Sequence, residues 1–263
     1  MTDFDITVAV TAQSETVVAG PTMRSAESAI RAAEAEGFRV ERVVGLDAAC
    51  EECRVFFTQP AFAAWKVAEL EMRDLGRTRN ALVDIATGRW MAFLDADDLF
   101  SENWLVAGAR RLAQAETTDD KVIVHPELNW IFDNDAFVYA KPAQDDPLFT
   151  PFYFYFVNYY DSLCMAPRAV HLEVPYLHYD IPAGLAFEGW PWNIETMAAG
   201  WRHVVVKDTI IFKRRRDMSL IIEANRRRTL IWPVEAMTID RVRDLGQPAA
   251  TALIKSAGSH RRD

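Results

Sequence analysis

The sequence predicts an α/β fold in which a mostly parallel, Rossmann-like central sheet is flanked by helices. The first observation is the order strand, helix, strand at residues 5–11, 22–36 and 39–46. The second is the apolar run at residues 90–94, which is short and has no polar alternation, as expected of a strand covered on both faces. Strands that alternate with helices pair in parallel through right-handed crossovers, so these segments belong to one sheet.

Turn residues mark the ends of these elements. Gly37 follows the Ala-rich first helix, and Asp47 follows the second strand. Further along, Thr78 can cap a helix that ends before Gly88, the expected left-handed stop. This helix and its tight turn lead directly into the buried strand and the acidic residues that follow it.

Three carboxylates, Asp95, Asp97 and Asp98, lie within four positions directly after the buried strand. Open α/β sheets bind ligands outside the carboxyl ends of their strands, which is where these acids fall. Carboxylates this close repel one another unless a cation holds them, and hard divalent cations prefer carboxylate oxygen. The pattern therefore predicts a divalent cation that also touches ligand phosphates. The alternative is a loop of helix-capping and solvated acids, which is the more common meaning of an isolated Asp-x-Asp.

The helix, turn, strand and acidic loop together resemble the family 2 glycosyltransferases of the GT-A fold. The residues that carry the resemblance are Gly76, Arg79, Asn80, Ala81, Thr87, Gly88, Leu94, Asp95, Asp97 and Asp98. The resemblance implies inverting transfer from a nucleoside-diphosphate sugar, with Mg²⁺ or Mn²⁺ neutralising the leaving diphosphate. It also implies that Asp97 ligates the metal, that Asp95 contacts ribose and metal, and that Arg79 steadies the nucleotide.

The resemblance extends to the ends of the first two strands, where the family places the nucleotide base. Thr11 and Asp47 occupy these positions, and a carboxylate can accept from the imino N–H of uracil or guanine. The family usually has a second acid beside this Asp, whereas Leu46 and Ala48 flank it here, which leaves UDP and GDP both open. The alternative for Asp47 is a turn residue at a strand end.

Residues 187–202 resemble the family's catalytic segment, with Pro191 in the first turn of a helix and Gly200 at its end. Gly189 replaces the usual catalytic Asp, so Glu188 is the remaining acid and the predicted general base for an acceptor hydroxyl. A helix N-terminus favours an ionised carboxylate. The alternative is that Glu188 only caps the helix, in a catalytically impaired nucleotide-binding protein with a non-enzymatic or regulatory role.

Two segments in the second half of the chain have an unusual composition. Aromatic residues are dense at 149–160, where they fit a wall for an acceptor saccharide, a surface against lipid, or part of a core. Basic runs follow at 213–216 and 226–228. By resemblance, Arg214 and Arg215 would clamp the diphosphate through bidentate hydrogen bonds. The alternatives are a solvated face and attraction to anionic lipid.

Composition limits the partners. The chain has 263 residues and a net charge of −9, which argues against general nucleic-acid binding. The first residues lack the pattern of a signal peptide, and no stretch approaches the roughly 20 apolar residues of a membrane span. We therefore expect a cytoplasmic protein and leave peripheral contact with the inner membrane surface open. The three cysteines fit a reducing compartment, and Cys50 and Cys53 lack the second pair that a zinc site needs.

The expected organisation is one GT-A domain over residues 1–263. Residues 1–120 form the nucleotide-sugar-binding half, 121–217 the smaller mixed acceptor and catalytic half, and 218–263 a C-terminal helical extension. The resemblance implies a saccharide or glycolipid acceptor in surface polysaccharide or glycolipid synthesis. A sugar nucleotidyltransferase is disfavoured, because residues 8–23 contain no Gly-rich phosphate loop.

Overall fold

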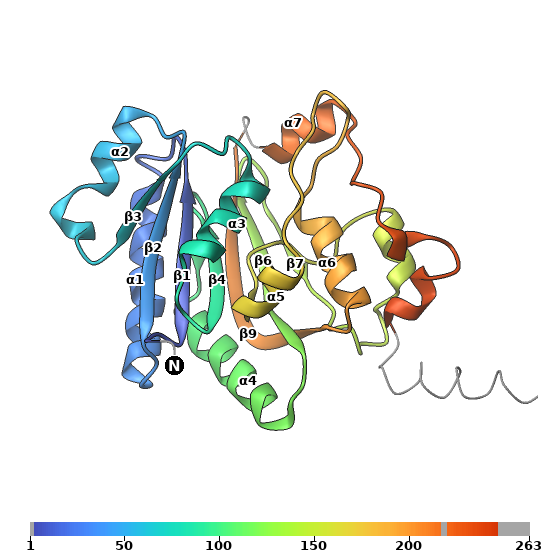
Figure 1. Cartoon of the computed structure of the whole chain (residues 1–263). Coiled ribbons are helices and arrows are strands. Elements are labelled where there is room, and N and C mark those ends of the chain that lie inside the picture. Colours follow the sequence, from blue (N-terminus) through green and yellow to red (C-terminus); the bar gives the residue numbers. More distant parts are fainter. Residues whose placement is uncertain (1–2, 217–219, 247–263) are drawn as a thin grey trace, which may run out of the picture.

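The computed structural model describes residues 3–216 and 220–246, and the described strands form one sheet of nine (Figure 1). The order across the sheet is β3-β2-β1-β4-β8-β6-β9-β5, with β7 paired to β6. The strands are β1 (Ile6–Ala12), β2 (Val40–Asp47), β3 (Lys66–Leu70), β4 (Trp90–Asp95), β5 (Leu99–Phe100), β6 (Val122–Asp133), β7 (Phe137–Ala140), β8 (Met165–Pro167) and β9 (Arg202–Arg215).

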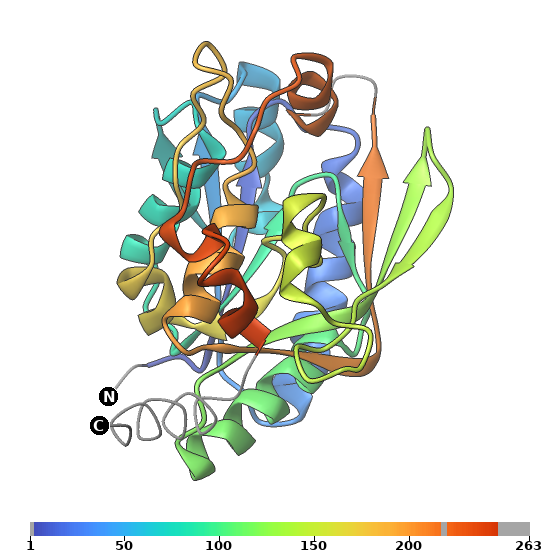
Figure 2. The ribbon, with the colours of Figure 1, turned by 90° about the vertical axis from the view of Figure 1, so that its right-hand side faces the viewer.

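The helices surround this sheet. They are α1 (Ala19–Ala35), α2 (Glu51–Phe57), α3 (Leu75–Ile85), α4 (Trp104–Thr118), α5 (Arg168–Glu173), α6 (Gly189–Ala198) and α7 (Leu220–Arg226). Short 3-10 turns are η1 (Pro60–Phe62), η2 (Pro151–Tyr155), η3 (Glu235–Met237) and η4 (Val242–Gly246). Helices α1 and α4 pack together on one face of the sheet, and α3 and α5 lie on the other (Figures 1 and 2).

The strands of the first half, β3, β2, β1 and β4, are parallel, which confirms the α/β class predicted from the sequence. Strands β1, β2 and β4 are apolar and almost completely buried, because helices cover both faces. The register places Thr11 beside Asp95, while Asp47 ends the strand on the other side of β1. The polar ends of three strands therefore meet at one edge of the sheet.

The strands of the second half are mixed in direction. Strand β8 runs antiparallel between β4 and β6, and β6 pairs in parallel with the long strand β9. The hairpin of β6 and β7 stands beside β9 at the right of Figure 2. The two-residue strand β5 pairs with β9 in the register Leu99 to Phe212. This pairing ties the acidic loop, which lies between β4 and β5, to the last strand of the sheet.

Helix α3 differs from its predicted boundaries. Asp74, not Thr78, is the N-cap, and its side chain accepts a hydrogen bond of 2.8 Å from the backbone N–H three residues on. Thr78 lies inside the first turn, where its hydroxyl donates to Asp47 at 2.6 Å. Gly88 does not have a left-handed backbone, so its prediction as a helix stop was wrong. A Cβ at this position would lie 2.6 Å from the backbone nitrogen of Thr7, so the close approach to β1 requires glycine.

The aromatic stretch contributes mainly to a second core. Phe154, Tyr159 and Tyr160 are buried and pack with apolar residues of α6. Tyr155 and Phe156, in contrast, are exposed. The core interpretation therefore holds for the buried three, and the exposed two leave part of the stretch at the surface.

The predicted C-terminal extension, residues 218–263, includes α7, η3 and η4. Positions 218–219 and 247–263 of that prediction lie outside the described residues. Within the ranges that are described, no helix combines the length and the apolar character needed to cross a membrane.

Candidate functional site

The candidate site lies at the carboxyl edge of the parallel strands, where β1 and β4 end. Thr11 and Asp95 are neighbours in the register, and Thr11 Oγ1 donates to Asp95 Oδ1 at 2.9 Å. Arg79 Nη2, from α3, donates to the same oxygen at 2.8 Å. Three residues predicted from separate segments of the sequence therefore meet at one carboxylate.

Arg79 is the centre of the charge network. Only 2% of its side chain is exposed, and its guanidinium contacts both Asp95 and Glu188. The rings of Phe93 and Tyr176 lie 5.9 and 5.7 Å from the guanidinium carbon. Burial acts to lower the pKa of Arg79, but the two carboxylates outweigh it and raise that pKa above its ordinary value. A cation held in this way stays charged and fixes β4 relative to the segment before α6.

Glu188 lies at the N-terminus of α6 but does not cap it, since its side chain makes no capping hydrogen bond. Its carboxylate instead contacts Arg79 Nη1, the Tyr179 hydroxyl and, at 3.4 Å, Ser162 Oγ. The side chain is almost completely buried. The structure therefore brings Glu188 to Asp95 through their shared arginine.

The packing around Gly189 explains why the acid of this segment stands at position 188. A Cβ added to Gly189 would collide with Ser162 Oγ. An aspartate at position 189 therefore has no room while Ser162 keeps its place. The carboxylate that enters the site comes from the preceding residue instead.

The other two carboxylates of the acidic loop are also matched by cations of the chain. Asp97 Oδ2 lies 2.7 Å from Arg216 Nη2, and Asp98 Oδ2 lies 2.9 Å from Lys213 Nζ. Arg216 also reaches Glu15, in the loop after β1, at 2.9 Å. The basic run stands out in the sequence, but these pairings were not predicted from it. The available signal was a lysine directly after the apolar run 210–212.

The pKa values of the three acids differ with their surroundings. Burial alone would raise the pKa of Asp95, but Arg79 and Lys213 hold it below its ordinary value. Burial and the charge of Asp95 raise the pKa of Asp97, although its paired arginine opposes them. Burial raises the pKa of Asp98 to about 7, even though Lys213 lowers it. Negative charge is therefore crowded at the second and third acids of the loop.

Asp95 and Asp97 are the carboxylates that fit a divalent cation. Among the described residues, no group of three or more His, Cys, Asp or Glu side chains is arranged to hold a metal ion. Two carboxylates are enough where ligand phosphates and water complete the coordination, which is the usual way that Mg²⁺ binds at phosphate sites. The crowding that raises the pKa of Asp97 is what such a cation would relieve. The donor set therefore fits a metal that binds together with a diphosphate.

Asp47 organises the loop between β3 and α3. Its carboxylate accepts from the backbone N–H groups of Met72, Arg73 and Asp74 and from the Thr78 hydroxyl. A carboxylate offers about four lone-pair sites, so a nucleotide base would have to replace one of these partners. The contact of Asp47 with the base stays a prediction.

Of the two arginines expected at the diphosphate, Arg214 lies nearer the acidic loop. Its Nε donates to the carbonyl oxygen of Asp97 at 3.3 Å, and its Nη1 lies 2.8 Å from Asp133 Oδ2. Arg215 pairs in register with Asp133 of β6. The structure thus brings Arg214 to the acidic loop, and the phosphate contacts of both arginines stay predictions.

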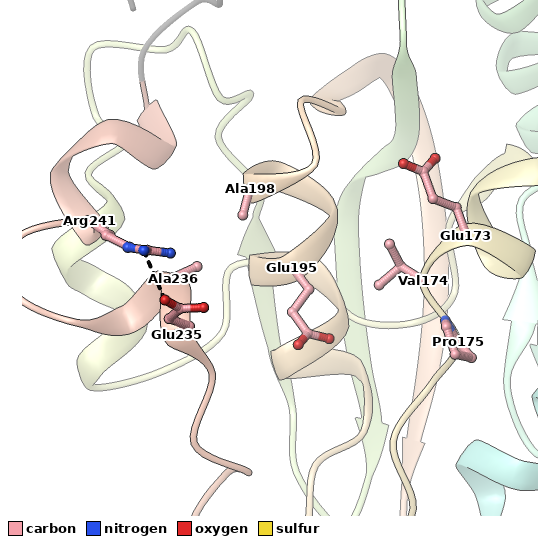
Figure 3. A pocket seen from close by; sticks show the side chains of 8 residues that line it. All are labelled: Glu173, Val174, Pro175, Glu195, Ala198, Glu235, Ala236 and Arg241. Atoms are coloured by element: carbon pink, nitrogen blue, oxygen red, sulfur yellow. Dashed lines mark ion pairs between the residues drawn. The ribbon is translucent and has the colours of Figure 1, made fainter.

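An open pocket of about 380 Å³ lies along α6 (Figure 3). Its lining residues are Glu173, Val174, Pro175, Glu195, Ala198, Glu235, Ala236 and Arg241. Within it Arg241 pairs with Glu235 at 2.8 Å. None of the residues predicted for the site lines this pocket, so it is not part of the candidate site.

Comparison with known proteins gives a family match over part of the chain and a shared fold. Residues 61–144 match the model of glycosyl transferase family 2. This segment includes Arg79 and the three acids of the loop. No protein with a curated description matches the chain.

Solved GT-A transferases share this fold. TarS of S. aureus, as residues 1–349 in complex with UDP-GlcNAc, has a TM-score of 0.58 at 14% identity, over 82% of this chain and 60% of that one. The longer TarS structure gives 0.59 at 14% identity, over 81% and 37%. GalNAc-T7 with UDP, GalNAc and Mn²⁺ gives 0.54 at 16% identity, over 81% and 44%. The chain therefore spans three fifths or less of these proteins, and the likeness confirms the GT-A fold.

Proposed function

Because the chain carries a glycosyl transferase family 2 segment in a GT-A fold, we propose that it transfers a sugar from a nucleoside-diphosphate sugar to an acceptor hydroxyl. The observation that carries the proposal is the network of Thr11, Asp95, Arg79 and Glu188. It joins an acid of the predicted nucleotide half to an acid of the predicted acceptor half. The carboxyl edge, where it lies, is the ligand-binding edge of open α/β sheets.

The donor in this proposal is a UDP or GDP sugar. Two proteins of the same fold support UDP, since TarS was solved with UDP-GlcNAc and GalNAc-T7 with UDP. In this chain Thr11, Arg79 and Asp95 would contact the ribose and its neighbouring phosphate, and Asp47 would contact the base. Thr11 and Arg79 already share one oxygen of Asp95, so they would orient that carboxylate for the ligand.

A divalent cation, Mg²⁺ or Mn²⁺, would be held by Asp95 and Asp97 and would neutralise the negative charge of the leaving diphosphate. GalNAc-T7 was crystallised with Mn²⁺. Arg214 and Arg215 would add bidentate hydrogen bonds to phosphate oxygens. The first of them already touches the acidic loop, which supports its part in this arrangement.

Glu188 is the proposed general base. It would take the proton of the acceptor hydroxyl as that oxygen attacks the anomeric carbon from the side opposite the diphosphate. The bond from the anomeric carbon to the diphosphate oxygen breaks, and the configuration inverts. Tyr179 and Ser162 hold the Glu188 carboxylate in place, and Arg79 fixes it relative to Asp95. Such positioning is itself a large part of catalysis, because small displacements of a reacting group are costly.

One observation favours a second candidate, a nucleotide-binding protein without transferase activity. The Glu188 carboxylate is buried and already engages three side chains, including the guanidinium of Arg79. An acceptor hydroxyl would have to displace one of these partners to reach it. Measured turnover separates this candidate from the first.

The acceptor in the proposal is a saccharide or glycolipid hydroxyl in surface polysaccharide or glycolipid synthesis, at the cytoplasmic face of a membrane. The exposed side chains of Phe152, Tyr155 and Phe156 support a peripheral contact with lipid. Sedimentation with anionic vesicles at low salt, and release at high salt, tests this part. Absence of co-sedimentation at low salt would contradict it.

Thermal shift with a panel of nucleoside diphosphates tests the proposal, with Mn²⁺ and with EDTA, followed by assays of donor hydrolysis. A ligand at 100 times its Kd stabilises the folded state by about 2.7 kcal/mol. We expect UDP or GDP to raise the melting temperature more with Mn²⁺ than with EDTA, and the matching nucleotide sugar to be turned over. Binding without turnover would support the second candidate, and no stabilisation by any nucleotide would contradict both.

A further inference from the structure

Beside the candidate site, the buried side chains of Lys141 and Asn129 meet the partly exposed carboxylate of Asp161, and each of the two buried side chains has one polar atom without a partner among the described residues. Lys141 directly follows β7, and its side chain is completely buried. Its Nζ lies 3.6 Å from Asp161 Oδ2, and among the described residues it finds no hydrogen-bond partner. A buried ammonium group is costly unless it is hydrogen-bonded, so a partner for it is to be expected.

Asn129 of β6 provides the complementary group. Its Nδ2 donates to Asp161 Oδ2 at 2.6 Å. Its Oδ1 is buried and, like the lysine nitrogen, has no partner within the described part of the chain. Burial alone would raise the pKa of Asp161, but Lys141 and Lys213 lower it to about 2, so the carboxylate only accepts hydrogen bonds. An unused donor and an unused acceptor thus flank one ionised carboxylate.

This cluster borders the candidate site on two sides. Lys213 Nζ pairs with Asp98 at 2.9 Å, and its charge also acts on Asp161. Ser162, the residue after Asp161, contacts Glu188 at 3.4 Å. Strands β7, β6 and β9 lie side by side in the sheet (Figure 2).

The arrangement of groups selects the class of ligand. A hydroxyl both donates and accepts, so neighbouring hydroxyls of a sugar ring can use the Lys141 donor and the Asn129 and Asp161 acceptors together. A metal ion is disfavoured, because Lys141 already brings a positive charge to within 3.6 Å of the carboxylate. An anion is disfavoured as well, because the carboxylate already balances that charge. A neutral, multiply hydroxylated ring satisfies all three side chains.

We propose that Asn129, Lys141 and Asp161 form the saccharide-binding subsite, where neighbouring hydroxyls of a pyranose replace the missing hydrogen bonds. The inference rests on the proposed transferase function for its sugar context. The pyranose belongs either to the donor or to the acceptor, and both present the same hydroxyl chemistry to the cluster.

Saturation-transfer NMR with free pyranoses tests the subsite directly. Glucose, galactose, mannose and N-acetylglucosamine are each measured alone and with UDP or GDP. We expect the wild-type chain to bind at least one of them, and Lys141→Met to weaken that binding about tenfold or more, because hydrogen bonds from charged donors are the stronger class. Lys207→Met is the matched control. Lys207 is an exposed lysine that pairs with Glu127 of β6, the strand that also carries Asn129.

The buried ion pair requires a second variant. Lys141→Met removes the cation that lies 3.6 Å from Asp161, and the loss of one partner of a buried ion pair can prevent folding. The double variant Lys141→Met/Asp161→Leu removes both charges and takes its place if the single variant does not fold. Loss of sugar binding with either folded variant supports the subsite.

Nucleotide-sugar titrations then identify the source of the pyranose. A variant that weakens binding of UDP-N-acetylglucosamine, UDP-glucose or GDP-mannose, but not of UDP or GDP, assigns the subsite to the donor. A variant with unchanged donor affinity and a raised KM for the acceptor assigns it to the acceptor.

Two results would overturn the subsite. One is the absence of any pyranose signal with the wild-type chain, alone or with nucleotide, and the other is the same signal in the wild-type and the Lys141 variants. Failure of the transferase proposal looks different. A chain that binds a pyranose through Lys141 but binds no nucleotide would keep the subsite and contradict the proposed function.

Discussion

Besides burial, the negative charges of Asp95 and Glu15 raise the pKa of Asp97. Asp97→Ala should therefore remove the metal-dependent part of UDP or GDP affinity, a loss of about tenfold or more, while the fold stays intact. Titration calorimetry in Mn²⁺ and in EDTA measures this difference. Asp120→Ala, which removes an exposed acid just after α4, is the control. Wild-type affinity of the Asp97 variant in both conditions would contradict the metal assignment.

Glu188 is the residue on which transferase activity depends. Glu188→Gln should lower kcat by about 10²–10⁴ and leave the Kd for the donor within about twofold, because the lost function is proton acceptance. Single-turnover assays with saturating donor separate the two quantities. Glu195→Gln, on the same helix, should keep wild-type kcat. Full activity of the Glu188→Gln variant would show that another group is the general base.

Gly189 and Ser162 form a steric pair that can be measured as stability. Gly189→Ala should destabilise the fold by about 1–3 kcal/mol, because its Cβ meets Ser162 Oγ. Ser162→Ala in the same chain should recover at least about 1 kcal/mol of this loss. Urea denaturation gives the double-mutant cycle, with Gly20→Ala as the control, since a Cβ there meets only ordinary contacts. Additive effects of the two substitutions would show that the contact is not the cause.

The sequence was informative for residues whose position depends on where a strand ends. Thr11 and Asp95 could be placed at one edge of the sheet, because parallel strands bring their carboxyl ends together, and Arg79 was predicted from the family resemblance. Lys213 and Arg216 could not, because their contacts depend on the pairing of β9 with a strand more than a hundred residues earlier. Local patterns do not contain that register.

At the level of elements, turn chemistry predicted the ends of α1 and α6 but not the end of α3, where Gly88 has no left-handed backbone. Gly37 and Gly200 take positive φ values of +88° and +87° where α1 and α6 end, as their positions suggested. The start of α3 was misjudged, because Asp74 and Thr78 are both competent caps and only the tertiary contact with Asp47 decides between them.

His171 of α5 packs against Trp192 of α6, and its burial makes the stability of the fold depend on pH. Its ring stacks on Trp192 at 4.9 Å and on Tyr176 at 5.6 Å, and neither ring nitrogen has a partner in the described part of the chain. Burial, with a smaller effect from Arg79, lowers the pKa of His171 to about 3. The unfolded chain takes up this proton near pH 6.5, so the stability it contributes is complete above about pH 7 and falls toward pH 3.

His171→Phe should remove this dependence. Between pH 7.5 and 5.5 the wild-type chain should lose about 1 kcal/mol more stability than the variant. At pH 7.5 the variant should be at least as stable as the wild type, because no unpaired ring nitrogen remains buried. Urea denaturation at the two pH values measures both quantities. Equal losses in the two chains would indicate that His171 is already protonated, or solvated, in the folded state.

For the whole molecule, Arg79 is one buried ionic connection between the two predicted halves. It holds Asp95 of β4 and Glu188 before α6, and both of these acids lie in largely buried surroundings. Arg79→Met should therefore lower the free energy of unfolding by about 3–5 kcal/mol, because two carboxylates lose their cation. Arg77→Met, on an exposed position of the same helix, should have little effect.

The cause of this loss can be checked by charge removal. If unpaired carboxylates are responsible, Arg79→Met combined with Asp95→Asn and Glu188→Gln should recover part of the stability. Thermal denaturation should show the single variant melting about 10 °C lower and the triple variant in between. A melting temperature of Arg79→Met within about 1 °C of the wild type would contradict the role of this arginine.

During synthesis on the ribosome, the acidic loop emerges long before the cations that pair with it. Lys213 follows Asp98 by 115 positions, and Arg216 comes later still. At about 5–20 residues per second, the loop waits on the order of ten seconds for these partners. In that interval β1, β2, β3 and β4 can already assemble, with Asp97 and Asp98 facing water at their edge. A nascent chain that stalls before β9 would thus keep this loop without Lys213 and Arg216, so the pairing of its charges is among the last contacts that the growing protein acquires.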